Sequence, residues 1–133
     1  MIHSHALRVY YEDTDLAGIV YYANYLKFIE RGRSEWIRGL GIDQRRLKAE
    51  EGVVFAVRRI EADFLRPARF DDELVVETRV EAFTGARIVL EQVVTRAGER
   101  LFQAIVTLVC LTEAGAPARV PAELRRKLAP ALH

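Results

Sequence analysis

A cluster of acidic side chains near the N-terminus is the first feature of this sequence that suggests chemistry. Glu12, Asp13 and Asp15 lie within four positions, and Gly18 follows them. Apolar residues at helical spacing begin at Tyr22, so the acidic run directly precedes the expected start of a helix. A carboxylate in this place is often only a cap or a complement to the helix macrodipole. The strand end before it, the glycine that permits close backbone approach and the outward-pointing amides of a helix start together favour a functional site.

These parts are suited to the hydrolysis of a thioester. Unpaired backbone amides around Tyr21 and Tyr22 would polarise the thioester carbonyl and stabilise the oxyanion that develops on it. A carboxylate is ionised at neutral pH, so Asp15 can either take a proton from water or attack the carbonyl itself. The leaving thiolate, with a pKa of about 8.5 by analogy with cysteine, departs without a strong general acid. The sequence leaves both roles of Asp15 open.

Other kinds of site are disfavoured by the residues present. The only histidines are His3, His5 and His133, all at the termini, which argues against a hydratase and against Ser-His-Asp or Cys-His catalysis. Ser34 lies within the expected helix and outside any GxSxG motif. Cys110 is the only cysteine and lies in an apolar run, so we interpret it as a small buried residue in a reducing compartment. The sequence has no Cys or His cluster for zinc and no Gly-rich phosphate motif, so no metal and no cofactor are expected.

The composition is that of one globular domain with little net charge. The 133 residues carry a formal charge of +1 and are 50% hydrophobic, so we expect a single domain over residues 1–133. Because basic and acidic residues nearly cancel, no general attraction to nucleic acid is expected. The N-terminal residues do not resemble a signal peptide, and no stretch approaches the ~18 apolar residues that cross a bilayer. We therefore expect a cytoplasmic protein without a transmembrane segment.

Hydrophobic spacing predicts one long helix and a set of strands. The helix is expected to begin at Tyr22, to run for about 17 residues, or roughly 25 Å, and to end between Gly39 and Gly41. Alternation of apolar and polar residues predicts five strands, over residues 6–12, 59–64, 73–82, 88–95 and 101–111. Short helices are expected over residues 43–50 and 120–129. The order β-α-β-β-β-β predicts an α+β fold, in which a curved antiparallel five-stranded sheet wraps around one long central helix.

The last expected strand, LFQAIVTLVCL, is apolar on both faces over most of its length. This pattern predicts that its outer face is covered by a partner subunit. The alternative is a central strand whose outer face is covered by the chain's own terminal helix.

The sequence also resembles a known family. The run VYYEDTDLAGIVYYANYLKFIERGRSEWIRGLG resembles the signature of the 4-hydroxybenzoyl-CoA thioesterase family, and most closely its bacterial branch of acyl-CoA thioesterases associated with the Tol-Pal cell-envelope system. The resemblance continues through VRRIEADFLRPARFDDELVVET to VCLTEAGAPARVPAEL, so it covers nearly the whole chain. It implies a hot-dog fold whose sheets pair edge to edge into a homodimer, often doubled into a homotetramer, with active sites at the dimer interface.

The resemblance also implies roles for individual residues. The family's essential aspartate corresponds to Asp15, and its oxyanion amide corresponds to the backbone of Tyr22. Close relatives commonly carry a histidine at the position of Tyr22, so any role of that histidine side chain is not carried over, whereas the backbone role is. Gly32 replaces an alanine that is usual in the family, which slightly weakens the helix but touches no expected chemistry.

The implied activity is hydrolysis of an acyl-CoA to the free acid and CoA, with a short-chain aliphatic or an aromatic acyl group. We expect the substrate to contact Gly18, Val20, Tyr21 and Tyr25. Among several arginines near the second strand, including Arg66 and Arg69, we assign Arg58 and Arg59 to the CoA phosphates. Relatives are linked to acyl-carrier protein and to phospholipid-synthesis enzymes. The alternative is a non-catalytic module that binds acyl-CoA or acyl-carrier protein, which would not need Asp15.

Overall fold

The structure, a computed structural model, describes residues 1–132, and His133 lies outside the described residues. One antiparallel sheet holds its long strands in the order β1-β3-β4-β5-β2, with the short β6 added to β5. The strands are β1 (His3–Arg8), β2 (Val53–Phe64), β3 (Glu73–Phe83), β4 (Arg87–Arg96), β5 (Glu99–Thr112) and β6 (Pro117–Ala118). The expected five strands are all present. The sheet nevertheless has six strands rather than five, because the chain turns back after β5 and pairs Pro117 and Ala118 with its end.

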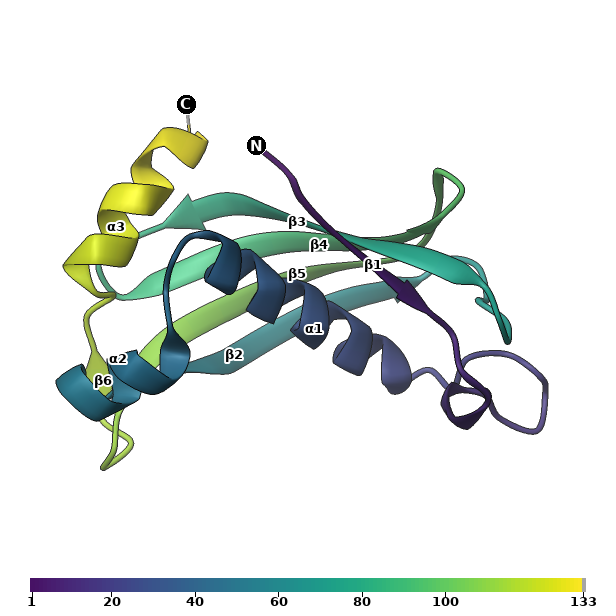
Figure 1. Cartoon of the computed structure of the whole chain (residues 1–133), viewed down its shortest axis with the longest axis horizontal. Helices are drawn as coiled ribbons and strands as arrows, with labels where there is room; N and C mark the ends of the chain where they lie inside the picture. Colours follow the sequence, from purple (N-terminus) through teal and green to yellow (C-terminus); the bar gives the residue numbers. More distant parts are fainter. Residues whose placement is uncertain (133) are drawn as a thin grey trace.

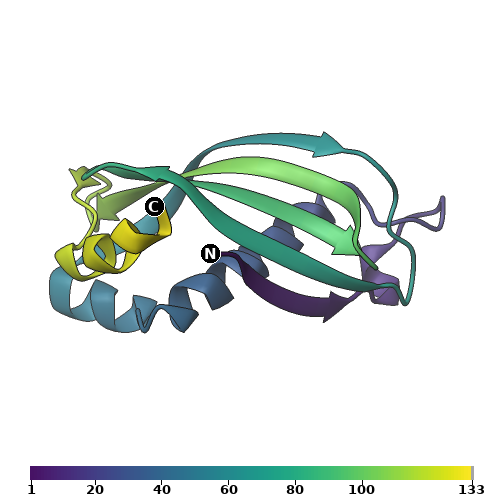
Figure 2. The ribbon, with the colours of Figure 1, turned by 90° about the horizontal axis from the view of Figure 1, so that it is seen from above.

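The long helix α1 (Asn24–Gly39) lies along the concave face of the sheet, as Figures 1 and 2 show, and confirms the predicted central helix. It buries Tyr25, Phe28, Ile29, Gly32, Trp36 and Ile37. The chain leaves the helix through Gly41, whose positive φ of 81° suits a residue without a side chain. Two shorter helices, α2 (Gln44–Glu51) and α3 (Ala122–Leu128), and two 3-10 segments, η1 (Tyr11–Asp13) and η2 (Ala129–Leu132), complete the fold.

Gly32 sets how closely α1 approaches the sheet. A Cβ atom added to Gly32 would lie 2.4 Å from Cγ1 and 2.9 Å from Cβ of Val76, on β3. Real side chains do not approach this closely, so any larger residue would force the helix or the strand to move. The glycine therefore has a packing role that its effect on helix propensity did not reveal.

A buried polar group ties α1 to the middle of the sheet. Gln92, on β4, is fully buried. Its amide Nε2 donates to the carbonyl of Ile29 and to Oγ1 of Thr78, each at 2.9 Å, and its Oε1 accepts from Arg33 Nη1 at 2.9 Å. Every polar atom of the Gln92 side chain thus has a partner, which makes burial of the amide tolerable and fixes the helix over β3 and β4.

The first strand differs from the prediction for residues 6–12. Its alternation is correct as far as Val9, which is fully buried, but β1 ends at Arg8 and Tyr11 is 81% exposed. The cause is Asp13, whose carboxylate Oδ2 accepts a hydrogen bond from the Tyr10 amide at 2.8 Å and so turns the chain into η1.

The C-terminal helix α3 lies on the same side of the sheet as α1 (Figure 2). Its Leu124 and Leu128 join the same core cluster as Trp36. The alternative in which this helix covers the outer face of the last strand is therefore wrong, and Ile105 and Val109 on that face remain half-buried in the single chain. None of the helices within residues 1–132 is long and apolar enough to span a membrane.

Candidate active site

Of the three clustered acids, Asp13 forms part of the local framework. Its side chain is 6% exposed and accepts the Tyr10 amide. Its backbone carbonyl accepts the Tyr21 amide at 2.9 Å and Asn24 Nδ2 at 2.9 Å. These bonds hold the acidic segment against the residues that lead into α1. Sequence reasoning missed this role, although an acid three residues after Tyr10 has the spacing of a side chain that binds a preceding backbone amide.

Asp15 begins a tight, exposed turn. Thr14 pairs with Val20, the Asp15 amide donates to Ile19 O at 2.9 Å, and Gly18 N donates to Asp15 O at 2.9 Å. Gly18 has a φ of +78°, a conformation that favours glycine at this turn. Carboxylate Oδ1 of Asp15 accepts the Ala17 amide at 2.9 Å, which orients the side chain. Within residues 1–132 the other oxygen, Oδ2, has no hydrogen-bond partner, so it is open to solvent and to a ligand.

The start of α1 has free amides next to this turn. Ala23 is the residue before the helix, and no side chain caps it. The Tyr22 and Ala23 amides donate no hydrogen bond within the described residues. The Tyr21 amide, by contrast, is occupied by Asp13 O, so the prediction of free amides around Tyr21 and Tyr22 is wrong for Tyr21. Because residue 13 is paired with residue 21, Asp15 and the Tyr22 amide lie on adjoining segments.

Aromatic rings form one side of this region. Tyr21, Tyr22 and Phe64 are 46%, 62% and 52% exposed, and the Tyr22 ring lies 4.9 Å from that of Tyr21 and 5.9 Å from that of Phe64. Behind them, Tyr25 is stacked on Phe102 at 5.0 Å with its ring nearly parallel. The exposed rings belong to a surface that a ligand can reach, whereas Tyr25 is 3% exposed and lies in the core.

The Asp15 turn is held to the rest of the protein by the segment between β2 and β3. Val20 N donates to Ala68 O at 2.8 Å, Ile19 pairs with Arg69, and Ala68 N donates to Tyr25 Oη at 3.0 Å. Burial raises the pKa of the Tyr25 hydroxyl above its usual value, and hence this group stays protonated.

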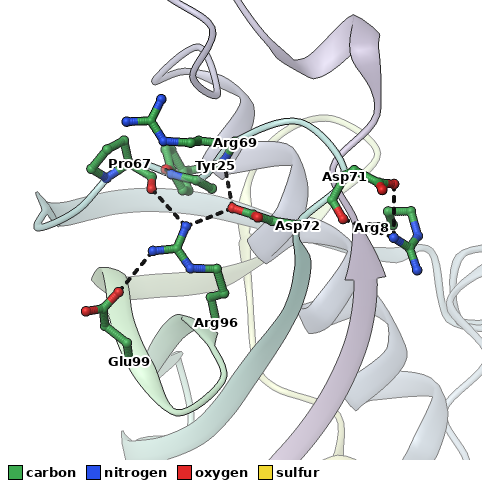
Figure 3. Close-up of polar contacts among 9 residues, drawn as sticks. Arg8, Tyr25, Pro67, Arg69, Asp71, Asp72, Arg96 and Glu99 are labelled. Atoms are coloured by element: carbon green, nitrogen blue, oxygen red, sulfur yellow. Dashed lines mark hydrogen bonds and ion pairs between the residues drawn. The ribbon is translucent and has the colours of Figure 1, made fainter.

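An ion pair fixes the far end of this segment, as Figure 3 shows. Arg96 Nη1 donates to Asp72 Oδ2 at 2.8 Å and to Pro67 O at 3.3 Å, and the Arg69 amide donates to Asp72 Oδ2 at 2.8 Å. Burial alone would raise the pKa of Asp72, but the Arg69 amide and the Arg96 guanidinium outweigh it and lower this pKa. No local pattern in the sequence predicts these contacts, because Arg96 lies in a different hairpin.

The remaining predicted site residues are dispersed. Gly18 is exposed at the turn, Val20 is buried beneath it, and Arg58 is exposed on β2. Arg59 lies beside a register shift in β2 and forms an ion pair with Glu61 at 3.1 Å. The two arginines precede Phe64 by five and six residues, which is roughly 15–20 Å along an extended strand. Their role at the CoA phosphates and the substrate contacts of Gly18, Val20 and Tyr25 stay predictions.

A groove of about 460 Å³ runs between α1 and β2. It combines apolar and charged side chains from Leu26, Lys27, Glu30, Arg31, Arg33, Val57 and Ile60. Burial lowers the pKa of the Arg33 guanidinium, which reaches from this groove to Gln92. Within residues 1–132, no group of three or more His, Cys, Asp or Glu side chains is arranged to hold a metal ion.

Comparison with known proteins places this arrangement in a family. The model of the thioesterase superfamily matches residues 17–103, which contain the Asp15 turn from Ala17 onward, α1 and strands β2 to β4. The chain belongs to the thioesterase superfamily. This thioesterase is similar to the acyl-CoA thioesterase YbgC of Haemophilus influenzae, with 43% identity over 108 residues that make up 81% of this chain and 79% of that protein.

Solved structures agree with the family and with the fold. A probable thioesterase from Bartonella henselae superposes with a TM-score of 0.88 at 40% identity, covering 91% of this thioesterase and 100% of that chain. A mutant 4-hydroxybenzoyl-CoA thioesterase, crystallised with 4-hydroxybenzoyl-CoA, superposes with a TM-score of 0.90 at 23% identity, covering 95% and 97%. The latter likeness concerns the fold, and it confirms the predicted hot-dog architecture.

Proposed function

We propose that this thioesterase hydrolyses acyl-CoA thioesters to the free acid and CoA. The observation that carries the proposal is the open carboxylate oxygen of Asp15, in a turn held beside the free amides of Tyr22 and Ala23. A nucleophile or base next to preorganised oxyanion donors is what acyl transfer to water requires. The names of relatives such as the Haemophilus influenzae acyl-CoA thioesterase support the choice of CoA as the thiol.

In the proposed mechanism the thioester carbonyl oxygen accepts the Tyr22 amide, and Asp15 acts on the carbonyl carbon. Acting as a general base, Asp15 takes a proton from water, whose oxygen forms the new C–O bond while the C–S bond breaks and thiolate leaves. Acting as a nucleophile, its carboxylate oxygen bonds to the acyl carbon while the C–S bond breaks and thiolate leaves, and water then hydrolyses the anhydride. In single-turnover hydrolysis in oxygen-18 water, label in the Asp15 carboxylate identifies an anhydride that water opens at that residue. Label in the released acid alone is expected when water attacks the acyl carbon, in the thioester or in the anhydride.

The role of the Tyr22 amide has a direct test. Tyr22→Pro removes an N–H that donates no hydrogen bond within residues 1–132, at a place just before the helix where proline is tolerated. We expect kcat to fall roughly 100-fold to 1,000-fold, the cost of losing one oxyanion donor. Tyr22→Phe is the matched control and should keep its activity. Equal activity of the proline and phenylalanine variants would contradict the proposed donor.

We propose short-chain aliphatic or aromatic acyl groups as substrates. The exposed rings of Tyr21, Tyr22 and Phe64 offer flat apolar contact beside Asp15, which suits a small planar or short acyl chain. Thiol release should be measured with acetyl-CoA to palmitoyl-CoA and with benzoyl-CoA and 4-hydroxybenzoyl-CoA. The expected result is a higher kcat/KM for the short and aromatic substrates than for palmitoyl-CoA. Binding of acyl-CoA without turnover of any substrate would instead favour a non-catalytic binding module.

We further propose that two copies pair along β2. This 12-residue strand is an edge of the sheet, with its outer side unpaired within residues 1–132. Val57 on β2 and Leu26 on α1 are each 42% exposed and face the same groove. An exposed apolar edge favours pairing with a second strand. In sedimentation velocity, Val57→Lys should shift dimers or tetramers toward monomers, whereas Ala6→Lys on the opposite edge should not. An unchanged assembly of Val57→Lys would contradict this interface.

The cellular setting is proposed from the family resemblance. We propose a cytoplasmic enzyme that works with acyl-carrier protein or phospholipid-synthesis enzymes, in connection with the Tol-Pal system. Arg58 and Arg59 are proposed to meet the CoA phosphates, and replacing both by glutamine should raise KM for acyl-CoA but leave KM for an acyl-pantetheine unchanged. A pull-down that recovers no acyl-carrier protein or phospholipid-synthesis enzyme would count against those partners only.

A further inference from the structure

The Asp15 turn has almost no contacts of its own with the core. Leu16, at its tip, is fully exposed, and the hydrogen bonds within the turn connect only its own residues. The position of Asp15 relative to α1 is therefore set by the bonds at the base of the turn. On one side, Tyr21 N and Asn24 Nδ2 both donate to Asp13 O. On the other side, Ile19 pairs with Arg69 and Val20 N donates to Ala68 O.

Ala68 connects the turn to the helix start through one side chain. Its carbonyl accepts Val20 N at 2.8 Å, while its amide donates to Tyr25 Oη at 3.0 Å. Tyr25 belongs to the first turn of α1, two residues after Ala23, whose amide is free. The Tyr25 ring cannot shift easily, since it is stacked on Phe102 at 5.0 Å and meets the buried Phe28 ring edge-to-face at 5.9 Å.

The segment that carries Ala68 is itself restrained from the other side. Arg96 binds Pro67 O and Asp72, and Asp72 binds the Arg69 amide (Figure 3). Ala68 is fully buried between these contacts. A displacement at Ala68 is thus passed to Val20 and so to the turn that carries Asp15.

We infer that Tyr25 is a positioning residue for Asp15, because its hydroxyl sets, through Ala68 and Val20, the distance between the Asp15 carboxylate and the free amides at the start of α1. This inference rests on the proposed function. The Tyr25 side chain is 3% exposed, and its effect on Asp15 passes through the peptide group of Ala68.

The test is Tyr25→Phe, which keeps the ring stacked on Phe102 and removes only the oxygen that accepts Ala68 N. We expect kcat to fall roughly tenfold to 100-fold with little change in KM, as for a misplaced catalytic group. Tyr11→Phe is the matched control, since its exposed hydroxyl has no hydrogen-bond partner within residues 1–132, and it should retain full activity. A kcat of Tyr25→Phe within twofold of the wild type would overturn the inference.

A second control separates positioning from simple loss of stability. Thr78→Val removes a buried hydroxyl that accepts Gln92 Nε2, far from the turn along β3. It should lower the melting temperature without lowering the kcat of the folded protein. If Thr78→Val lowers kcat as much as Tyr25→Phe does, the effect is a general consequence of destabilisation and the inference is wrong.

A double-mutant cycle tests whether Tyr25 acts through Asp15. Rates of the wild type, Tyr25→Phe, Asp15→Asn and the double variant are measured with enzyme in excess over acyl-CoA, so that slow turnover is detected. The double variant should be about as slow as Asp15→Asn alone, because a misplaced Asn adds no further loss. Multiplied losses would show that Tyr25 acts independently of Asp15 and would overturn the inference. Full activity of Asp15→Asn would instead refute the proposed function itself.

Discussion

Replacement of Gln92 by leucine should be among the most destabilising of the substitutions in this protein that nearly conserve side-chain volume. Gln92→Leu preserves the approximate volume but removes the partners of Arg33, Thr78 and the Ile29 carbonyl. The hydrogen bond to the half-buried Arg33 guanidinium contributes at the lower end of the range that is typical of hydrogen bonds to charged groups, and each neutral hydrogen bond contributes about 1 kcal/mol. The free energy of unfolding is therefore expected to fall by about 2–4 kcal/mol. For a chain of this length, such a loss lowers the melting temperature by roughly 6–16 °C.

Denaturant and thermal unfolding, monitored by circular dichroism, measure this loss. Gln103→Leu is the matched control, because Gln103 lies on the outer face of the neighbouring strand β5 and binds the exposed Asp63 and Arg100. Its free energy of unfolding should stay within about 0.5 kcal/mol of the wild type, as for surface substitutions. A Gln92→Leu protein as stable as the Gln103→Leu protein would refute the assignment of the buried amide as the link between α1 and the sheet.

Further predictions concern packing, acid stability and thiol reactivity. Gly32→Ala should lower the free energy of unfolding by about 1–2 kcal/mol, since the cost of overpacking against Val76 exceeds the stability gained from the higher helix propensity of alanine. Adding Val76→Ala should recover most of this loss. A Gly32→Ala protein more stable than the wild type would contradict the prediction. Because the folded protein lowers the pKa of Asp72, the ionised carboxylate stabilises the fold at pH values above its usual pKa of 3.8, and this stabilisation is lost as the pH falls through the lowered pKa. The free energy of unfolding of Asp72→Asn should therefore depend less on pH than that of the wild type between about pH 5 and pH 2. Parallel pH dependences of the two proteins would contradict this prediction. Burial raises the pKa of Cys110 to about 11, so iodoacetamide should react roughly 100-fold more slowly with the native protein than with the protein in urea; equal rates contradict burial of the thiol.

The central helix and the strands could be predicted because their patterns are local. The apolar stripe from Tyr25 to Ile37 repeats at helical spacing, and α1 indeed ends at Gly39. Strand β3 alternates cleanly over residues 73–80, and β5 alternates between buried and half-buried residues over residues 102–111, because one face of the sheet is turned toward the core. In β4 the alternation stops at residues 92–95, which are all buried. The prediction failed at Tyr11, where one hydrogen bond from the Asp13 side chain stops the strand and overrides the continuing alternation.

The candidate site was predictable in part for the same reason. Asp15, Gly18 and Tyr22 fall within one short segment, so composition and spacing locate the turn and the helix start. The framework around them is not local, because Tyr25 and Ala68 are 43 positions apart and the Arg96–Asp72 pair joins the end of β4 to the connection before β3. Such contacts depend on the packed fold, and no pattern in the sequence carries them.

The rate of thiol release from acyl-CoA by Asp15→Asn, compared with Asp43→Asn, tests the catalytic role of Asp15 most directly. Asp43 is a matched control, because its carboxylate also accepts nearby backbone amides, from Arg45 and Arg46, at the start of α2. We predict that Asp15→Asn, folded like the wild type, loses at least about 100-fold in kcat, whereas Asp43→Asn keeps its activity. Equal rates for the two variants would contradict the assignment of Asp15 as the working carboxylate.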